Sequence, residues 1–139
     1  MHEHSMETIE IELAILARRL TSNDKKVGNL DRSAYLLLHQ ISAHGSAGVK
    51  ALAEEFHLDI STVSRQTAAL EQKGYARKIP DPSDGRAYSL EITDKGAKQL
   101  HQYKQARMAR VKELLKHWSE DERQLFGNLL TKFNRTFID

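Results

Sequence analysis

Two short helical patterns separated by only three residues constrain the fold of this sequence most. Apolar residues recur at helical spacing over residues 49–56 and again over 60–73, and only His57-Leu58-Asp59 lies between the two stretches. Asp59 precedes the second stretch, where its carboxylate can accept hydrogen bonds from the free amides that open a helix. Two short helices joined by such a tight turn are typical of a helix-turn-helix.

A β-hairpin is predicted directly after the second of these helices. Gly74 ends the helix, and residues 75–79 and 87–92 have the composition of short strands. The segment between the strands is dense in turn-forming residues: Pro80, Asp81, Pro82, Ser83, Asp84 and Gly85. A helix-turn-helix followed by a small hairpin is the element order of a winged helix-turn-helix, so the fold class is mainly α with a β-hairpin wing.

The flanking segments predict further helices, about six in all. A first helix is expected over about 6–20 with Ser5 as its cap, and a second from Asp31, its cap, to Gly45. Thr93 is expected to start a long helix to about residue 117, and Ser119 begins a segment with capping-box spacing that opens the last helix. We expect a single domain over 1–139, with the winged helix-turn-helix over about 31–92 and flanking helical regions over about 1–30 and 93–139.

The 60–73 helix carries side chains of the kind that read DNA bases. Arginine pairs with guanine edges, glutamine with adenine, and serine or threonine with bases or phosphates in the major groove. The residues expected to face away from the core positions of this helix, mostly in its first two turns, are Ser61, Thr62, Ser64, Arg65, Gln66 and Ala69. The alternative is an ordinary polar helix face, but the tight turn before the helix and the hairpin after it favour a recognition helix.

The hairpin supplies cations for a second contact with DNA. Arg86 follows the expected tip, where an arginine suits the narrow, electronegative minor groove, and Asp84 is placed to hold its guanidinium. Arg77 and Lys78 on the first strand are candidates for phosphate contacts. The alternative for the tip is a solvent-exposed ion pair on a turn.

Composition excludes several other classes of protein. The formal net charge is only +2, so DNA binding has to rest on the placement of individual cations. The chain has no cysteine, which excludes disulfides and thiol-based redox sensing, and it has no run of about 18 apolar residues that could span a membrane. We therefore expect a cytoplasmic protein without a cofactor.

The central sequence resembles the MarR family of bacterial regulators. The resemblance rests on Leu52-Ala53-Glu54-Glu55-Phe56, Ser61-Thr62-Val63-Ser64-Arg65, Leu70-Glu71-Gln72-Lys73-Gly74, Asp81-Pro82-Ser83-Asp84-Gly85-Arg86 and Leu90-Glu91-Ile92-Thr93-Asp94-Lys95-Gly96. It implies a triangular homodimer with interlocking terminal helices, a recognition helix in the major groove and a wing arginine in the minor groove. It also implies a repressor that small, often phenolic, effectors release from DNA, with Tyr35, His39 and Tyr103 as candidate ligand contacts.

The apolar stripes on the terminal helices independently predict a homodimer. A winged core of 40 to 45 residues cannot cover two striped helices at opposite ends of the chain, whereas a second copy can. A two-fold dimer would match a pseudo-palindromic operator in double-stranded DNA, with about 31–92 of each subunit binding DNA and about 1–30 and 93–139 forming the dimer.

Three other functions stay open at this point. Seven histidines raise the question of a metal-responsive regulator, but their spacing is poor for a shared ligand set, and no metal site is predicted. No catalytic motif or phosphate-binding glycine loop stands out, so no enzyme is predicted. A winged helix that binds only protein partners remains the main alternative.

Overall fold

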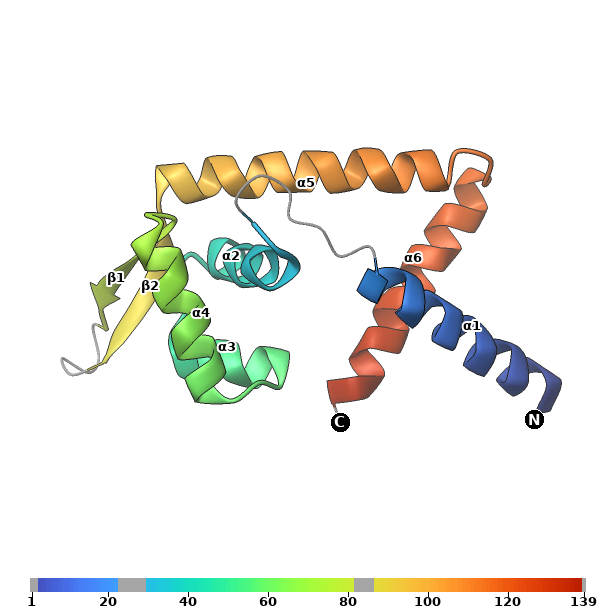
Figure 1. Ribbon diagram of the computed structural model, residues 1–139, viewed down its shortest axis with the longest axis horizontal. Coiled ribbons are helices and arrows are strands. Elements are labelled where there is room, and N and C mark those ends of the chain that lie inside the picture. The colour runs from blue at the N-terminus through green and yellow to red at the C-terminus, as the bar shows by residue number, and fades with distance from the viewer. Residues whose placement is uncertain (1–2, 23–29, 82–86, 139) are drawn as a thin grey trace.

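The computed structural model describes residues 3–22, 30–81 and 87–138 and has two ends joined by one long helix (Figure 1). At one end, three helices and a β-hairpin pack together. At the other end lie the first and last helices, and α5 (Asp94–Leu114) spans the distance between the two groups. The elements besides α5 are α1 (Glu3–Ser22), α2 (Arg32–His44), α3 (Val49–Phe56), α4 (Ile60–Gln72), β1 (Ala76–Pro80), β2 (Tyr88–Ile92), α6 (Glu120–Arg135) and a 3-10 turn (Thr136–Ile138).

The hydrophobic core lies entirely in the end that contains the hairpin. Apolar side chains of α3 and α4 lie in it, together with side chains of α2, β1, β2 and α5, and Phe56 of α3 packs against it partly buried. Its buried apolar members are Leu30, Leu37, Leu38, Ile41, Leu52, Ala53, Val63, Leu70, Tyr75, Ala76, Leu90 and Tyr103. Residues 31–92 with the first half of α5 therefore form the packed winged helix-turn-helix predicted from the sequence.

The hairpin pairs β1 with β2 in antiparallel register, from Ala76 opposite Ile92 to Pro80 opposite Tyr88. Both strands begin one residue later than predicted. Tyr75 does not belong to β1, because its amide donates a hydrogen bond to the carbonyl of Leu70. This hydrogen bond and the positive φ of Gly74, +82°, end α4. A third segment joins the sheet, since Ala47 and Leu90 exchange two backbone hydrogen bonds of 3.0 and 2.8 Å.

Two predicted helix caps are wrong and two others are confirmed. Asp31 caps α2 by accepting from the amide of Ala34 at 2.9 Å, and Ser119 caps α6. Asp59 has the extended backbone of a cap residue, but its side chain makes no capping hydrogen bond to α4. Ser5 does not cap α1 either, because the helix already begins at Glu3 and includes it.

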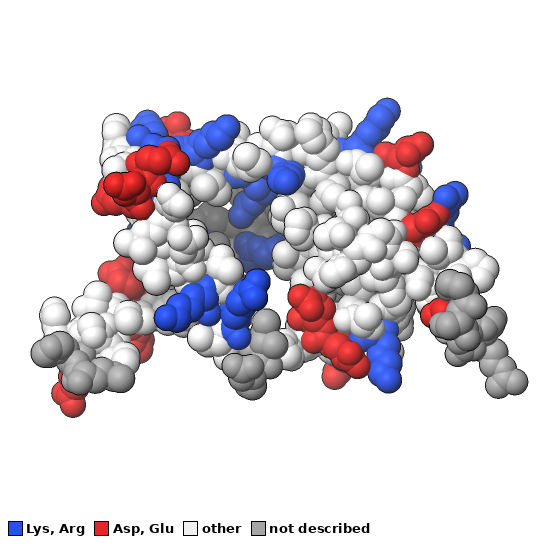
Figure 2. All heavy atoms as spheres, turned by 180° about the vertical axis from the view of Figure 1, so that it is seen from behind, with Lys and Arg blue, Asp and Glu red and all other residues white. Residues whose placement is uncertain are grey.

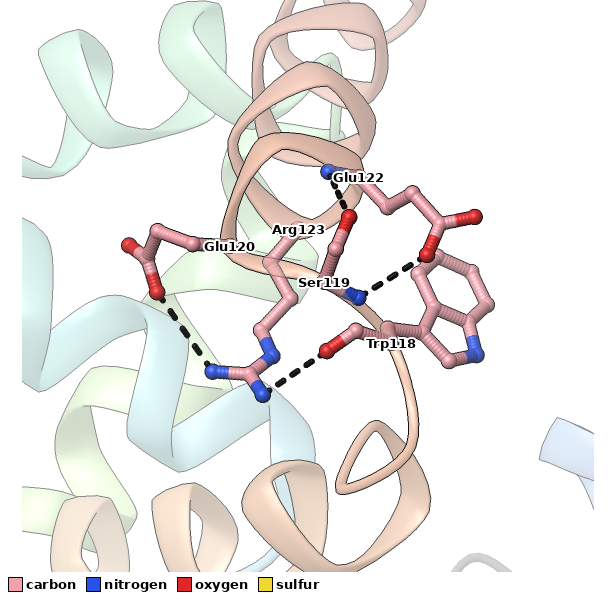
Figure 3. Close-up of polar contacts among 5 residues, drawn as sticks. All are labelled: Trp118, Ser119, Glu120, Glu122 and Arg123. Carbon is pink, nitrogen blue, oxygen red and sulfur yellow. Dashed lines mark hydrogen bonds and ion pairs between the residues drawn. The ribbon is translucent and has the colours of Figure 1, made fainter.

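The corner between α5 and α6 is fixed by polar contacts of its own residues (Figure 3). The amide of Ser119 donates to Glu122 Oε1 at 2.8 Å, and the amide of Glu122 donates to Ser119 Oγ at 3.1 Å, as the capping-box spacing predicts. Arg123 donates to the carbonyl oxygen of Trp118 at 2.9 Å, and the Trp118 ring packs against Phe126. These contacts set the direction in which α6 leaves α5.

The terminal helices leave their apolar side chains exposed. Every side chain of α1 from residue 3 to residue 20 is exposed, and α6 buries none of its residues in this subunit. Among the described helices, none combines the length and the apolar character needed to cross a membrane.

Candidate nucleic-acid interface

The side of α4 that faces away from the core carries four of the predicted DNA-reading residues. Val63, Thr67 and Leu70 anchor the helix in the core. Ser61 and Arg65 are exposed on the opposite side, and Thr62 and Ser64 are half-buried along the two edges of the helix. The helix therefore presents hydroxyl groups and one guanidinium in its first two turns, as the sequence predicted.

Gln66 does not belong to this exposed side, and the expectation that it faces away from the core is wrong. It follows Val63 by three positions and precedes Leu70 by four, so the helix turns it toward the same side as these core residues. Gln66 Oε1 is buried, and among the described residues no donor reaches it. Gln66 also lines a pocket against α2, so its side chain points behind the helix.

A groove of about 700 Å³ separates the start of α4 from the hairpin. Lys50 and Glu54 of α3 and Ser64 of α4 line one wall, and Asp81 and Tyr88 belong to the hairpin side. The groove brings the recognition-helix candidates and the wing side by side on one surface. A surface of this shape can fit over the sugar–phosphate backbone that separates the major and minor grooves of DNA.

Arg77, a predicted phosphate contact, is paired within the hairpin. Its guanidinium bonds to the carboxylate of Glu91, the residue directly opposite it in the strand register. The Arg77 side chain remains 70% exposed, whereas that of Glu91 is 27% exposed. Glu91 thus holds the arginine at the surface of the wing, a role that sequence reasoning missed because it depends on the register.

Lys78 also has a partner across the hairpin. Its Nζ lies 4.4 Å from the centre of the Tyr88 ring, a cation–π arrangement that leaves the ammonium group in contact with water. Both strand cations are therefore oriented by β2. The other two wing candidates, Asp84 and Arg86, lie outside the described residues.

The face opposite to that of Figure 1 shows basic and acidic side chains interspersed (Figure 2). The small net charge of +2 fits this mixture. Several basic side chains border part of the hollow between the two ends of the molecule on this face (Figure 2).

The three residues proposed as ligand contacts lie together, where α2 packs against α5. The rings of Tyr35 and Tyr103 stack with their centres 4.3 Å apart, and His39 lies 6.1 Å from Tyr35. Tyr103 is buried, so only Tyr35 borders an open pocket of about 320 Å³. Its other lining residues are all on α5: Lys104, Arg107, Met108, Val111 and Lys112.

Three cations of α5 border this pocket: Lys104 and Lys112, which are exposed, and Arg107, which is half-buried. In the part of the chain that the structure describes, no three histidine, aspartate or glutamate side chains come close enough together to hold a metal ion.

Comparison with known proteins agrees with this geometry. The sequence model of the MarR family matches residues 30–88, which are α2 to the start of β2. An uncharacterized HTH-type transcriptional regulator of Bacillus subtilis (strain 168), YxaD, is 47% identical over 99% of this chain and 99% of its own length. The chain belongs to the MarR family.

Solved structures share the fold over all or nearly all of the chain. A MarR family protein from Bacillus stearothermophilus superimposes with a TM-score of 0.82 at 18% identity, covering 100% of this chain and 99% of that one. The structure of Streptococcus pneumoniae FabT in complex with DNA matches with a TM-score of 0.66 at 19% identity, covering 96% and 94% of the two chains. The MarR fold thus includes both terminal helices of this chain, beyond the region that the family model matches.

Proposed function

We propose that this MarR-family chain is a transcriptional regulator that binds double-stranded DNA with α4 in the major groove. The observation that carries the proposal is the exposed side of α4, where Ser61 and Arg65 stand opposite the residues that anchor the helix. Such groups hydrogen-bond to base edges and phosphates. The structure of FabT in complex with DNA supports DNA binding by a protein of this fold.

The wing is proposed to contact the backbone and the adjacent minor groove. Arg77 and Lys78 are exposed on β1 and held by β2, so each can approach a phosphate without first ordering a free side chain. Arg86 is assigned to the minor groove on the sequence motif alone, with Asp84 as its partner.

A homodimer is proposed as the DNA-binding form. In a single subunit α1 and α6 expose large apolar side chains that include Ile9, Leu13, Leu125 and Leu129. Contiguous apolar surface of this kind marks a protein interface. A two-fold dimer places two copies of α4 on a pseudo-palindromic operator. Residues 1–30 and 93–139 would then serve dimerisation, and the protein would work in the cytoplasm, where bacterial DNA lies.

Regulation by a small molecule is proposed for the pocket beside Tyr35. The pocket has an apolar floor of Met108 and Val111, and Lys104 and Arg107 border it. This combination suits an aromatic anion, whose binding would release a repressor from its operator. Aromatic carboxylates that release bound DNA in a mobility-shift assay would support this assignment, and a set that binds without releasing it would contradict it.

A mobility-shift assay on promoter DNA, including that of the chain's own gene, tests the DNA-binding proposal. We expect salt-sensitive binding, and Arg65→Ala should weaken the specific complex roughly 10-fold or more because it removes a base contact. Arg110→Ala is the matched control, since Arg110 is exposed in the second half of α5, a helix that begins near α4 and runs away from it (Figure 1). Unchanged affinity in Arg65→Ala would contradict the placement of α4 in the major groove. Unchanged affinity in Arg86→Ala would contradict the contact of the wing with the minor groove.

The same assay separates the alternatives. A winged helix used only for protein contacts would bind no promoter fragment at any salt concentration. A metal-responsive regulator would change its affinity on addition of Zn²⁺ or of a chelator.

A further inference from the structure

Tyr88 of β2 lies in the groove between the hairpin and the first turns of α3 and α4. It lines this groove together with Lys50 of α3 and Ser64 of α4, and it is 38% exposed. Among the residues that the structure describes, none forms a hydrogen bond with the Tyr88 hydroxyl. The sequence analysis did not single out this residue, although it places a hydroxyl between the recognition helix and the wing.

Lys78 and Tyr88 share the side of the hairpin that faces the helices. Side chains alternate between the two sides of a strand, and residues directly opposite each other in the register point to the same side. Lys78 is opposite Leu90, which is buried in the core, and Tyr88 precedes Leu90 by two positions. Arg77 and Glu91 therefore lie on the other side of the hairpin. The two strand cations thus face different parts of any DNA that the wing enters.

The ring of Tyr88 sets the position of the Lys78 ammonium group, whose Nζ lies 4.4 Å from the ring centre. A lysine side chain loses rotamer freedom when it binds a phosphate, and a contact made before binding reduces that loss. Tyr88 therefore offers two things to an anion in the groove: its own O–H donor and a cation held beside its ring.

Two carboxylates, Glu54 and Asp81, also line the groove. They repel an anion, so the groove disfavours a small free anion that has no other contact with the protein. A phosphate of DNA is different, because contacts elsewhere on the duplex bring it to the groove. A hydroxyl is also a common donor to the phosphates of DNA.

We propose that Tyr88 binds the strand of DNA backbone that passes over this groove. Its hydroxyl donates to a phosphate oxygen, and its ring positions Lys78 toward the same stretch of backbone. The inference rests on the proposed function, which places α4 in the major groove on one side of that backbone and the wing in the minor groove on the other. Arg77, on the far side of the hairpin, then faces the second backbone that borders the minor groove.

Tyr88→Phe tests the hydroxyl, because it keeps the ring. The probe is a short fluorescent DNA duplex of random sequence, since a phosphate contact does not depend on the operator. We expect the full chain to bind it at low salt, as measured by fluorescence anisotropy, and Tyr88→Phe to bind roughly 10-fold more weakly, as expected for a hydrogen bond to a charged group. The slope of log K against log salt should stay the same, because no charge is lost.

A double-mutant cycle tests the positioning of Lys78. Lys78→Met should weaken binding and reduce the salt slope by about 1 for each wing that contacts DNA. In a Tyr88→Leu background, which lacks the ring, the same substitution should cost less, because Lys78 is then no longer held toward the backbone. Lys116→Met is the matched control. Lys116 is an exposed lysine that follows α5 at its far end, and its effect should be the same with and without the Tyr88 ring.

The outcomes separate this inference from the function on which it rests. If the unmodified chain binds the duplex but Tyr88→Phe binds it equally well, the hydroxyl contact is excluded and the DNA-binding proposal stands. An equal cost of Lys78→Met in both backgrounds excludes the positioning role in the same way. If the unmodified chain does not bind the duplex at any salt concentration, the inference and the proposed function both fail.

Discussion

The carbonyl oxygen of Tyr75 lies where a side chain on Gly96 would begin. A Cβ on Gly96 would be 2.0 Å from that oxygen, and the same carbonyl accepts from the amide of Thr93 at 3.0 Å. The Thr93 hydroxyl in turn donates to the carbonyl of Gly74 at 2.5 Å. These contacts join the segment that follows α4 to the first turn of α5.

Gly96→Ala should therefore destabilise the protein. The new methyl group meets backbone atoms, which cannot move aside as the end of a flexible side chain can, and the side chain of Ile92 is also within 2.9 Å. We expect a loss of about 3 kcal/mol in the free energy of unfolding, at the upper end of overpacking effects, measured by urea denaturation.

Gly48→Ala is the control for this experiment. A Cβ on Gly48 would lie 3.7 Å from the nearest atom, an ordinary contact, and the residue has φ −83°, which alanine adopts freely. Its cost should stay below about 1 kcal/mol, the difference between glycine and alanine at a helix cap. Equal losses in the two variants would show that close packing at Gly96 does not explain the effect.

Thr93→Val tests the polar half of the same junction. Valine keeps the shape of the side chain but loses the hydroxyl that accepts from the amide of Gly96 at 3.0 Å and donates to Gly74. The loss of a cap and of a second hydrogen bond should cost about 1–3 kcal/mol in unfolding experiments. Thr93→Ser, which restores the hydroxyl, should recover most of it, and failure of this rescue would contradict the role of the hydroxyl.

The Arg77–Glu91 pair should affect DNA binding more than stability. Glu91→Gln removes the carboxylate that holds the guanidinium, and because the Arg77 side chain is 70% exposed, we expect a change of less than about 1 kcal/mol in unfolding. The variant should bind DNA more tightly, because the removal of one negative charge from the wing should outweigh the loss of the contact that orders Arg77. Arg77→Ala should weaken binding and reduce the dependence of log K on log salt by about 1. An unchanged salt dependence would exclude Arg77 as a phosphate contact.

Structural features that depend on residues close together in the sequence were predicted correctly in most cases. The order of helices and hairpin, the caps at Asp31 and Ser119, and the end of α2 at Gly45 are local features, and the structure confirms them. The failures at Ser5 and Asp59 are local as well: a residue type that caps helices does not fix where a helix starts or which way the side chain turns.

The rest depends on contacts between distant segments. Gly96 was noted in the sequence as part of a motif. The reason for a glycine at this position is the close approach of the Tyr75 carbonyl, which is seen only in the folded structure. The pairing of Arg77 with Glu91 requires the strand register. The inward direction of Gln66 was open to prediction, since its spacing from Val63 and Leu70 places it beside the core.

The exposed apolar surface of the terminal helices leads to the last prediction, which concerns the dimer. Leu125 and Leu129 on α6 are 59% and 53% exposed in one subunit, and α6 lies apart from the core near the hairpin (Figure 1). If a second copy covers this surface, a charge placed there becomes buried without a partner. Leu129→Glu should then weaken dimerisation by about 2–4 kcal/mol, which is roughly 30- to 1000-fold in the dissociation constant. Analytical ultracentrifugation over a concentration series measures this dissociation constant.

Leu58→Glu is the control for this experiment. It introduces the same charge at a leucine that is 42% exposed in the turn before α4, and this variant should leave the dimer intact. A monomeric unmodified chain, or equal effects of the two variants, would show that α6 is not the dimer interface.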